Sequence, residues 1–273
     1  MPDTPRDVPP CEVREVARRL QIAYVVDRSD QLGEEPVAAL VRAILSQNTS
    51  DRNRDVAMAR LIERFPTWDA VADAPLAELV ATIRYTNYAP TKAARIQEIL
   101  RRLRGERGAI TLDFLREWPT DAVERYLLGL KGVGYKTAAC VLAFALGRPV
   151  FPVDTHVRRV GIRLGWLTKR MNERQAHARM TALCPPELVL PLHFGMWAHG
   201  HFTCRPVPRC GRCPIYEFCR FEAKTAPAGI PPDRLPQVAP LARWTPAGEE
   251  QYPLPEAADE APLPREGVAS PFT

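Results

Sequence analysis

The sequence lacks the patterns that mark membrane-spanning or secreted proteins. No apolar run reaches about 18 residues. The N-terminus, MPDTPRDVPPCEVRE, shows no basic stretch followed by an apolar one. We therefore expect a cytoplasmic protein without a membrane partner, whose seven cysteines do not form a disulfide framework. A nucleotide-type phosphate-binding loop is also missing, so no nucleotide cofactor is expected.

The alternation typical of β-strands is equally scarce, and apolar residues recur at helical spacing nearly throughout. The predicted fold class is all-α, with many short helices. A chain of 273 residues is long enough for one large core or two smaller ones. Helices are expected at residues 12–26, 36–47, 52–65, 76–84, 91–104, 121–128, 135–146, 154–165, 172–183 and 187–200.

The two ends of the chain differ from this body. Residues 223–273 hold 11 of the 28 prolines, and 221–273 carry eight acidic and four basic residues. We expect disorder in an arm at residues 1–11 and in a Pro-rich tail at 222–273. The whole chain has a net charge of +5, so residues 1–220 carry about +9. A basic body suits a polyanion such as DNA, although a solvated arginine-rich surface fits the charge equally well.

The stretch CRPVPRCGRCPIYEFC brings four cysteines together at spacing C-x5-C-x2-C-x5-C. Its members are Cys204, Cys210, Cys213 and Cys219. Four thiolates this close suit either a tetrahedral zinc site or an iron–sulfur cubane. Zinc sites commonly pair two C-x2-C units and only one is present, which favours a [4Fe–4S] cluster without deciding the matter. Four arginines lie in or next to this stretch and can offset the charge of such a cluster, namely Arg205, Arg209, Arg212 and Arg220. The first three are candidates to face DNA phosphates.

A second motif, LLGLKGVGYKTAACVLAFAL, predicts a helix, a tight turn and another helix. Gly132 and Gly134 permit unusual backbone angles, so the N–H groups of Gly132, Val133 and Gly134 are candidates for a phosphate-binding nest. A glycine pair of this kind is often only a turn. Lys131, just before it, is a candidate phosphate contact.

Lys136 and Asp154 raise a question about chemistry. Lys136 either grips phosphate or acts as a nucleophile, since a free amine can attack an electrophilic carbon. Asp154, in the stretch VDTH, can orient water, act as a base or stabilise positive charge on a sugar. It can equally be the N-cap of the helix that starts there. For His156 we favour a structural hydrogen bond.

Three stretches together resemble the endonuclease III family of DNA glycosylases, within the helix-hairpin-helix superfamily: ILSQNTSD, LKGVGYKTA with VDTHVRRV, and HGHFTC with the three later cysteines. Their order and separation agree over about residues 12–221. The resemblance implies one six-helix domain at 37–148, which contains the hairpin. It also implies a [4Fe–4S] domain formed by 12–36 and 149–221, with double-stranded DNA bound in the cleft between the domains. We expect a monomer that associates with the nucleoid when bound to DNA.

The resemblance also implies roles for single residues. Lys136 would attack C1′ of the sugar of a flipped-out damaged nucleotide, form a Schiff base and cut the strand by β-elimination, assisted by Asp154. Gln47 and Asn48 would lie where the base was removed, and Tyr88 would wedge into the duplex. This chain departs from the family in having Asn48 for glutamine, and Asn87-Tyr88-Ala89 for Gly-Leu-Tyr. The first cysteine spacing is also one residue short.

These inferences predict a bifunctional glycosylase and abasic-site lyase for oxidised pyrimidines. Two alternatives stay open at this point. One is a monofunctional glycosylase for mismatched thymine, uracil or another lesion, and the other is a non-catalytic iron–sulfur protein that binds DNA.

Overall fold

The computed structural model describes residues 4–27, 31–225, 229–245 and 248–251, and this part of the chain is mostly helical, as predicted. The α-helices are α1 (Pro10–Ala23), α2 (Pro36–Leu45), α3 (Asp51–Arg64), α4 (Trp68–Asp73), α5 (Leu76–Thr82), α6 (Ala89–Arg107), α7 (Thr120–Leu128), α8 (Tyr135–Cys140), α9 (Thr155–Leu164), α10 (Glu173–Leu183), α11 (Val189–Ala198) and α12 (Leu235–Val238). Two of them run on as π-helical segments, α8 into η3 (Val141–Ala145) and α11 into η5 (His199–Thr203). Short 3-10 turns occur at η2 (Asp113–Glu117), η4 (Pro186–Leu188), η6 (Cys210–Arg212) and η7 (Tyr216–Phe218). No helix in these ranges is long and apolar enough to cross a membrane.

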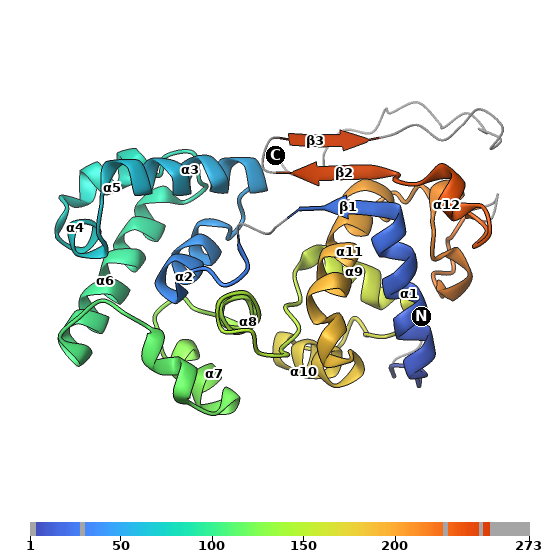
Figure 1. The fold of residues 1–273 in the computed structure, drawn as a ribbon, viewed down its shortest axis with the longest axis horizontal. Helices are drawn as coiled ribbons and strands as arrows, with labels where there is room; N and C mark the ends of the chain where they lie inside the picture. Colours follow the sequence, from blue (N-terminus) through green and yellow to red (C-terminus); the bar gives the residue numbers. More distant parts are fainter. Residues whose placement is uncertain (1–3, 28–30, 226–228, 246–247, 252–273) are drawn as a thin grey trace.

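The described residues form two separate hydrophobic cores, which agrees with the two helical domains of the predicted fold class. Figure 1 shows the corresponding two groups of helices. The first core is built by α2 to α8, with Leu40 and Leu100 fully buried. The second joins α1 to α9, α10 and α11, with Leu20 and Trp166 fully buried. Because α1 comes first in the chain and packs on α11, the second core is assembled from both ends of the sequence.

A small sheet extends the second core beyond what the sequence predicted. It contains β1 (Tyr24–Val26), β2 (Ala242–Thr245) and β3 (Gly248–Gln251) in the order β1-β2-β3. β1 and β2 are parallel with Tyr24 opposite Ala242, and β2 and β3 are antiparallel with Ala242 opposite Gln251. The Leu241 N–H also donates to the Ala23 carbonyl over 2.7 Å.

The expected loose attachment of the tail therefore differs from the structure over residues 229–245. Leu235, Leu241 and Trp244 are at most 4% exposed and belong to the second core. Their apolar side chains, rather than the surrounding prolines, decide the local structure, because each buries surface against α1 or α11. Residues 252–273 lie outside the described part of the chain.

The N-terminal arm also differs from the expected disorder where it is described. Val8 is 6% exposed in the second core, and the Arg6 N–H donates to the Gly165 carbonyl over 3.1 Å. The first helix starts at Pro10, because proline fits the first turn of a helix. Residues 1–3 lie outside the description.

Candidate active site

A cavity of about 540 Å³ lies between the two cores. Lys136 and Asp154, the two predicted catalytic residues, both line it. The first domain also contributes Ser46, Gln47 and Asn48, whereas the second contributes side chains from α9, α10, α11 and η5. The sequence-predicted pair is thus brought to one place by helices of different domains.

Lys136 is the second residue of α8 and is half-buried. Its Nζ donates to Ser46 Oγ over 3.2 Å, and Ser46 Oγ in turn donates to the Ala43 carbonyl over 2.7 Å. One helical turn after Lys136, Cys140 is buried at the cavity wall. Burial raises the pKa of the Cys140 thiol, while the charge of Lys136 lowers it and that of Asp154 raises it. This thiol is therefore close to both charges.

Asp154 is the N-cap of α9, as the structural alternative predicted. Its Oδ1 accepts from the Val157 N–H over 2.7 Å. An ionised carboxylate offers about four lone-pair sites, so the cap leaves acceptor capacity for a second partner. Capping therefore fixes the Asp154 side chain at the cavity and leaves its carboxylate able to accept a further hydrogen bond.

The two histidines nearest this pair have defined hydrogen bonds. His177 Nε2 accepts from the Val153 N–H over 3.0 Å, so Nδ1 carries the proton and donates to the Glu173 carbonyl over 2.9 Å. His156 Nδ1 accepts from Arg159 over 3.2 Å, which agrees with the structural role expected for it. Burial lowers the pKa of both histidines. Both are thus favoured in the neutral form at pH 7.

The hairpin before Lys136 contacts two side chains: Gln47, which the resemblance pointed to, and Arg95, which the sequence did not single out. Gly132 has φ of +78°, and a Cβ there would lie 2.0 Å from Arg95 Nε. Gln47 Nε2 donates to the Gly132 carbonyl and to Thr137 Oγ1, each over 3.2 Å, while Arg95 donates to Gln47 Oε1 over 3.0 Å. Gln47 thus joins the loop after α2 to the hairpin.

The rest of the predicted phosphate nest is only partly open. The Val133 N–H donates to the Leu130 carbonyl over 3.1 Å, and the Val133 side chain is buried in the first core. Gly134 is the N-cap of α8 and is exposed. Lys131 is exposed and pairs with Glu98 over 2.9 Å. Phosphate binding by this hairpin stays a prediction, with Val133 N–H already used by the turn.

Asn48 and Tyr88, predicted to enter the DNA, lie on two loops that contact each other. They have φ of 49° and 59°, and no other non-glycine residue in the described ranges has a positive φ. Asn87 joins the loops, because its side-chain amide donates to the Asn48 carbonyl and its backbone N–H donates to Thr49 Oγ1. The Tyr88 side chain is 68% exposed. Strained backbone of this kind is concentrated at functional sites.

The side chain of Lys92 is hydrogen-bonded to the loop that carries Asn48, and the sequence did not single this residue out. It is 3% exposed, and its Nζ donates to the Leu45 carbonyl over 2.7 Å and to Thr49 Oγ1 over 2.8 Å. Burial, together with the charge of Arg95, lowers the pKa of Lys92 to about 8. Its place at the start of α6 gave no signal, since lysine is common on exposed helix faces.

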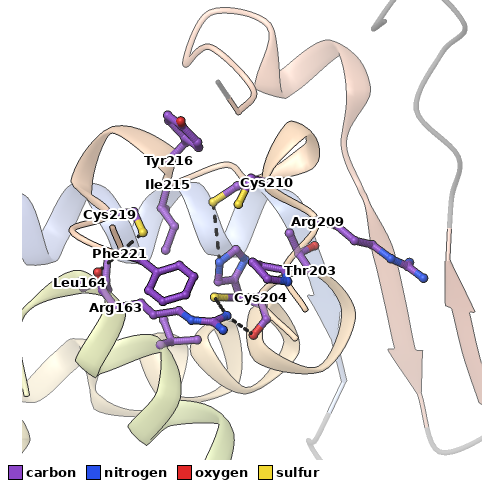
Figure 2. A pocket seen from close by; sticks show the side chains of 14 residues that line it. Arg163, Leu164, Thr203, Cys204, Arg209, Cys210, Ile215, Tyr216, Cys219 and Phe221 are labelled. Atoms are coloured by element: carbon purple, nitrogen blue, oxygen red, sulfur yellow. Dashed lines mark hydrogen bonds between the residues drawn. The ribbon is translucent and has the colours of Figure 1, made fainter. Parts of the chain in front are cut away.

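The four predicted metal-ligating cysteines, Cys204, Cys210, Cys213 and Cys219, line one pocket and form no disulfide (Figure 2). Burial raises the pKa of three of these thiols, those of Cys204, Cys213 and Cys219. Among the residues described, no three His, Cys, Asp or Glu side chains are arranged to hold a single metal ion. The four sulfurs share one pocket, and their binding of a metal cluster stays a prediction.

Buried donors surround these sulfurs. Arg163 is 8% exposed, and its guanidinium donates to Cys204 Sγ over 3.1 Å (Figure 2). It also donates to the Arg205 carbonyl over 2.7 Å. His199 Nε2 lies 3.8 Å from Cys213 Sγ. A buried cation beside four thiols is costly unless negative charge is close by. The donor set therefore fits an anionic thiolate-bound cluster.

The three arginines predicted to bind DNA differ in their surroundings. Arg205 is exposed, beside Val207, which is 83% exposed at the tip of the loop. Arg209 is half-buried and lines the cysteine pocket. Arg212 donates to the Leu241 carbonyl over 2.9 Å, and burial lowers its pKa. Arg212 is thus tied to the C-terminal segment, and a DNA contact by any of the three stays a prediction.

The chain is similar to known DNA-repair proteins. It is 39% identical over 167 residues to "Putative DNA glycosylase At3g47830" of Arabidopsis thaliana, covering 61% of this chain and 57% of that protein. It is 35% identical over 188 residues to Endonuclease III of Thermotoga maritima, covering 68% and 84%. Among solved structures, a trapped covalent intermediate of endonuclease III with DNA superimposes with a TM-score of 0.63 at 28% identity, covering 78% of this chain and 97% of that one.

The chain spans little more than half of the plant relative's length. The family signature matches residues 41–186, which include the loop after α2, the hairpin, Lys136 and Asp154. The chain therefore belongs to the HhH-GPD superfamily of base excision DNA repair proteins, and within it resembles endonuclease III.

Proposed function

We propose that this protein is a DNA glycosylase with abasic-site lyase activity, acting on damaged pyrimidines in duplex DNA. The observation that carries the proposal is the meeting of Lys136 and Asp154 at one cavity between the two helical domains. A cavity of about 540 Å³ is large enough for a flipped-out nucleotide. The similarity to an endonuclease III trapped covalently on DNA supports the same chemistry.

In the proposed reaction, the neutral amine of Lys136 attacks C1′ of the damaged nucleotide. A C1′–N bond to the lysine forms, and the bond from C1′ to the base breaks with its electron pair leaving on the base. Opening of the sugar ring then gives a protonated Schiff base. Loss of a proton from C2′ and departure of the 3′ phosphate cut the strand. Release of the aldehyde by water regenerates the lysine.

Neighbouring residues prepare this step. The hydrogen bond from Lys136 Nζ to Ser46 Oγ limits where the amine can point. Asp154, fixed as the N-cap of α9, supplies negative charge to the sugar as positive charge develops at C1′. His177 is locked in one neutral tautomer by two backbone groups, so we assign it to the cavity wall and not to proton transfer.

The four cysteines would hold a [4Fe–4S] cluster at the far end of the second domain. Such a cluster, when bound, would have all its positions taken by protein thiolates and so supplies structural support, not catalysis. Arg163 would balance its charge and fix the backbone that carries Arg205. Absorbance near 400 nm and iron content of the purified protein test this assignment.

Borohydride trapping tests the proposed reaction. Thymine glycol, uracil, abasic and undamaged duplexes are incubated with the wild-type protein and with Lys136→Ala, in the presence of borohydride. We expect a covalent adduct on thymine glycol and on the abasic duplex, absent with Lys136→Ala. Base release from the uracil duplex without an adduct would favour a monofunctional glycosylase. Tight DNA binding without base release or adduct would favour a non-catalytic protein.

A further inference from the structure

One buried polar group at the cavity has no partner among the residues described. Gln31 is 5% exposed and lines the cavity, and its Nε2 finds no hydrogen-bond acceptor in the described part of the chain. Leaving a buried amide donor unsatisfied lowers the stability of the folded protein. Such groups are uncommon in native proteins and call for an explanation. An acceptor carried into the cavity by a ligand would remove the cost.

The loop that carries Gln31 is fixed against an aromatic wall. Two residues after Gln31, the Gly33 N–H donates to the Phe144 carbonyl over 2.9 Å. Phe144 stacks on Phe194 with ring centroids 5.6 Å apart and planes inclined by 13°. Both phenylalanines line the same cavity as Gln31. The cavity thus combines flat apolar surface with an amide donor, which are the two features that recognise a nucleobase.

Several other polar groups of the cavity already have a partner within the protein. Ser46 serves Lys136, both ring nitrogens of His177 are bonded to the backbone, and Asp154 caps α9. Gln31 comes from a different segment, between β1 and α2, and its Nε2 is not hydrogen-bonded to any of these described groups. Its amide is therefore placed to act on the base and not on the sugar.

We propose that Gln31 Nε2 donates a hydrogen bond to a ring carbonyl of the extrahelical base, and so determines which bases are excised. Pyrimidines fit this role, because thymine, uracil and cytosine derivatives all keep a carbonyl at C2, including those with a saturated 5,6 bond. The inference rests on the proposed glycosylase function. It is separable from that function because an abasic site contains no base to read.

The test compares two reactions of the same variants. Gln31→Ala removes the amide, and Gln31→Glu keeps the shape but replaces the donor with an acceptor. Leu32→Ala, an exposed neighbour, is the folding control. The wild-type protein is first tested on duplexes that contain thymine glycol, dihydrouracil, 5-hydroxycytosine or uracil. Single-turnover excision rates of all variants are then measured on the duplex from which the wild type removes the base. The same rates are measured on an abasic duplex of matched sequence.

We expect base excision to fall roughly tenfold or more in both Gln31 variants, while abasic-site cleavage stays within about twofold of wild type. Leu32→Ala should leave both rates unchanged. An equal fall in both reactions would show that Gln31 only maintains the fold, and no fall in either would show that the amide reads nothing; both outcomes overturn the proposal. Wild-type cleavage of abasic sites without excision of any base in the panel would overturn it as well. If the wild type does not cleave abasic sites, the proposed function itself is rejected.

Discussion

Lys136 Nζ and Ser46 Oγ lie 3.2 Å apart, across the boundary between α8 and the loop after α2. The same loop carries Gln47, whose amide is bonded to the hairpin that precedes Lys136. One short segment therefore orients both the amine and the turn in front of it. Separate motifs in the sequence become one unit only when the first domain folds.

Replacing Ser46 with alanine should slow strand cleavage about tenfold. A hydrogen bond to a charged amine contributes about 1.5–3 kcal/mol, and only the part of it that acts in the transition state changes the rate. DNA affinity should change little. Single-turnover cleavage of an abasic duplex measures the rate, and Ser50→Ala, which removes the N-cap of α3 on the same loop, is the matched control. Equal slowing in both variants would mean that loop stability, and not the Lys136 contact, is responsible.

Lys92→Met should change how stability depends on pH. The folded-state pKa of Lys92 is about 8, below its ordinary value of 10.5. Between these values the unfolded state binds more protons, so the free energy of unfolding of the wild type rises with pH. Below about pH 8 both states are protonated at Lys92, and this residue adds no pH dependence. Urea unfolding is measured at pH 7 to 10. The free energy of unfolding of the wild type should rise relative to that of Lys92→Met from about pH 8 upward. A constant difference over this range would contradict the assignment.

Two glycine substitutions should have opposite effects. Gly132→Ala should lower the free energy of unfolding by about 1–2 kcal/mol and weaken binding to undamaged duplex, since its φ is +78° and Arg95 fills the space of a Cβ. Gly105→Ala, inside α6 with open space around it, should raise stability by about 0.5–1 kcal/mol. Urea denaturation and fluorescence anisotropy measure both effects. A neutral Gly132→Ala would remove the steric argument for the hairpin.

Tyr88→Leu should alter the preference for the opposite base or for the lesion, because Tyr88 is exposed on a strained loop and an aromatic ring stacks on bases more extensively than leucine does. Excision rates are compared across lesions and opposite bases, with the exposed Ile62→Ala as the control. An unchanged substrate spectrum would show that the departure at Tyr88 has no bearing on recognition.

Trp244→Ala should destabilise the protein by about 3–5 kcal/mol, as expected for removing a buried tryptophan. Trp244 packs edge-on against Trp197 with ring centroids 6.0 Å apart, and Trp197 lines the active-site cavity. Arg243→Ala, exposed on the same strand, should change stability by less than about 0.5 kcal/mol. Chemical denaturation of the two variants distinguishes a structural C-terminal segment from a dispensable one.

Local patterns predicted much of this molecule. Helical spacing located ten of the helices, and motif positions led to Lys136, Asp154 and the four cysteines, whose chemistry depends on residue type and spacing. The short helices α4 and α12 were missed, because six and four residues give too few periodic positions.

Features that depend on distant segments escaped prediction. β2 is a strand because it pairs with β1, more than two hundred residues earlier, and Trp244 is buried because Trp197 is there. Ser46, Lys92 and Gln31 acquire their roles from partners or cavities that no local pattern encodes. The prolines around Trp244 suggested disorder, and tertiary burial outweighed that composition.

The central claim, that Lys136 is the nucleophile, is tested most directly by mapping the covalent adduct. Wild-type protein is reduced with borohydride on an abasic duplex, digested, and the modified peptide is sequenced by mass spectrometry. We predict that the sugar remnant is on Lys136 Nζ, and that Lys136→Ala yields no adduct while still binding the duplex. An adduct on another lysine or on the N-terminal amine, or undiminished trapping by Lys136→Ala, would contradict the claim.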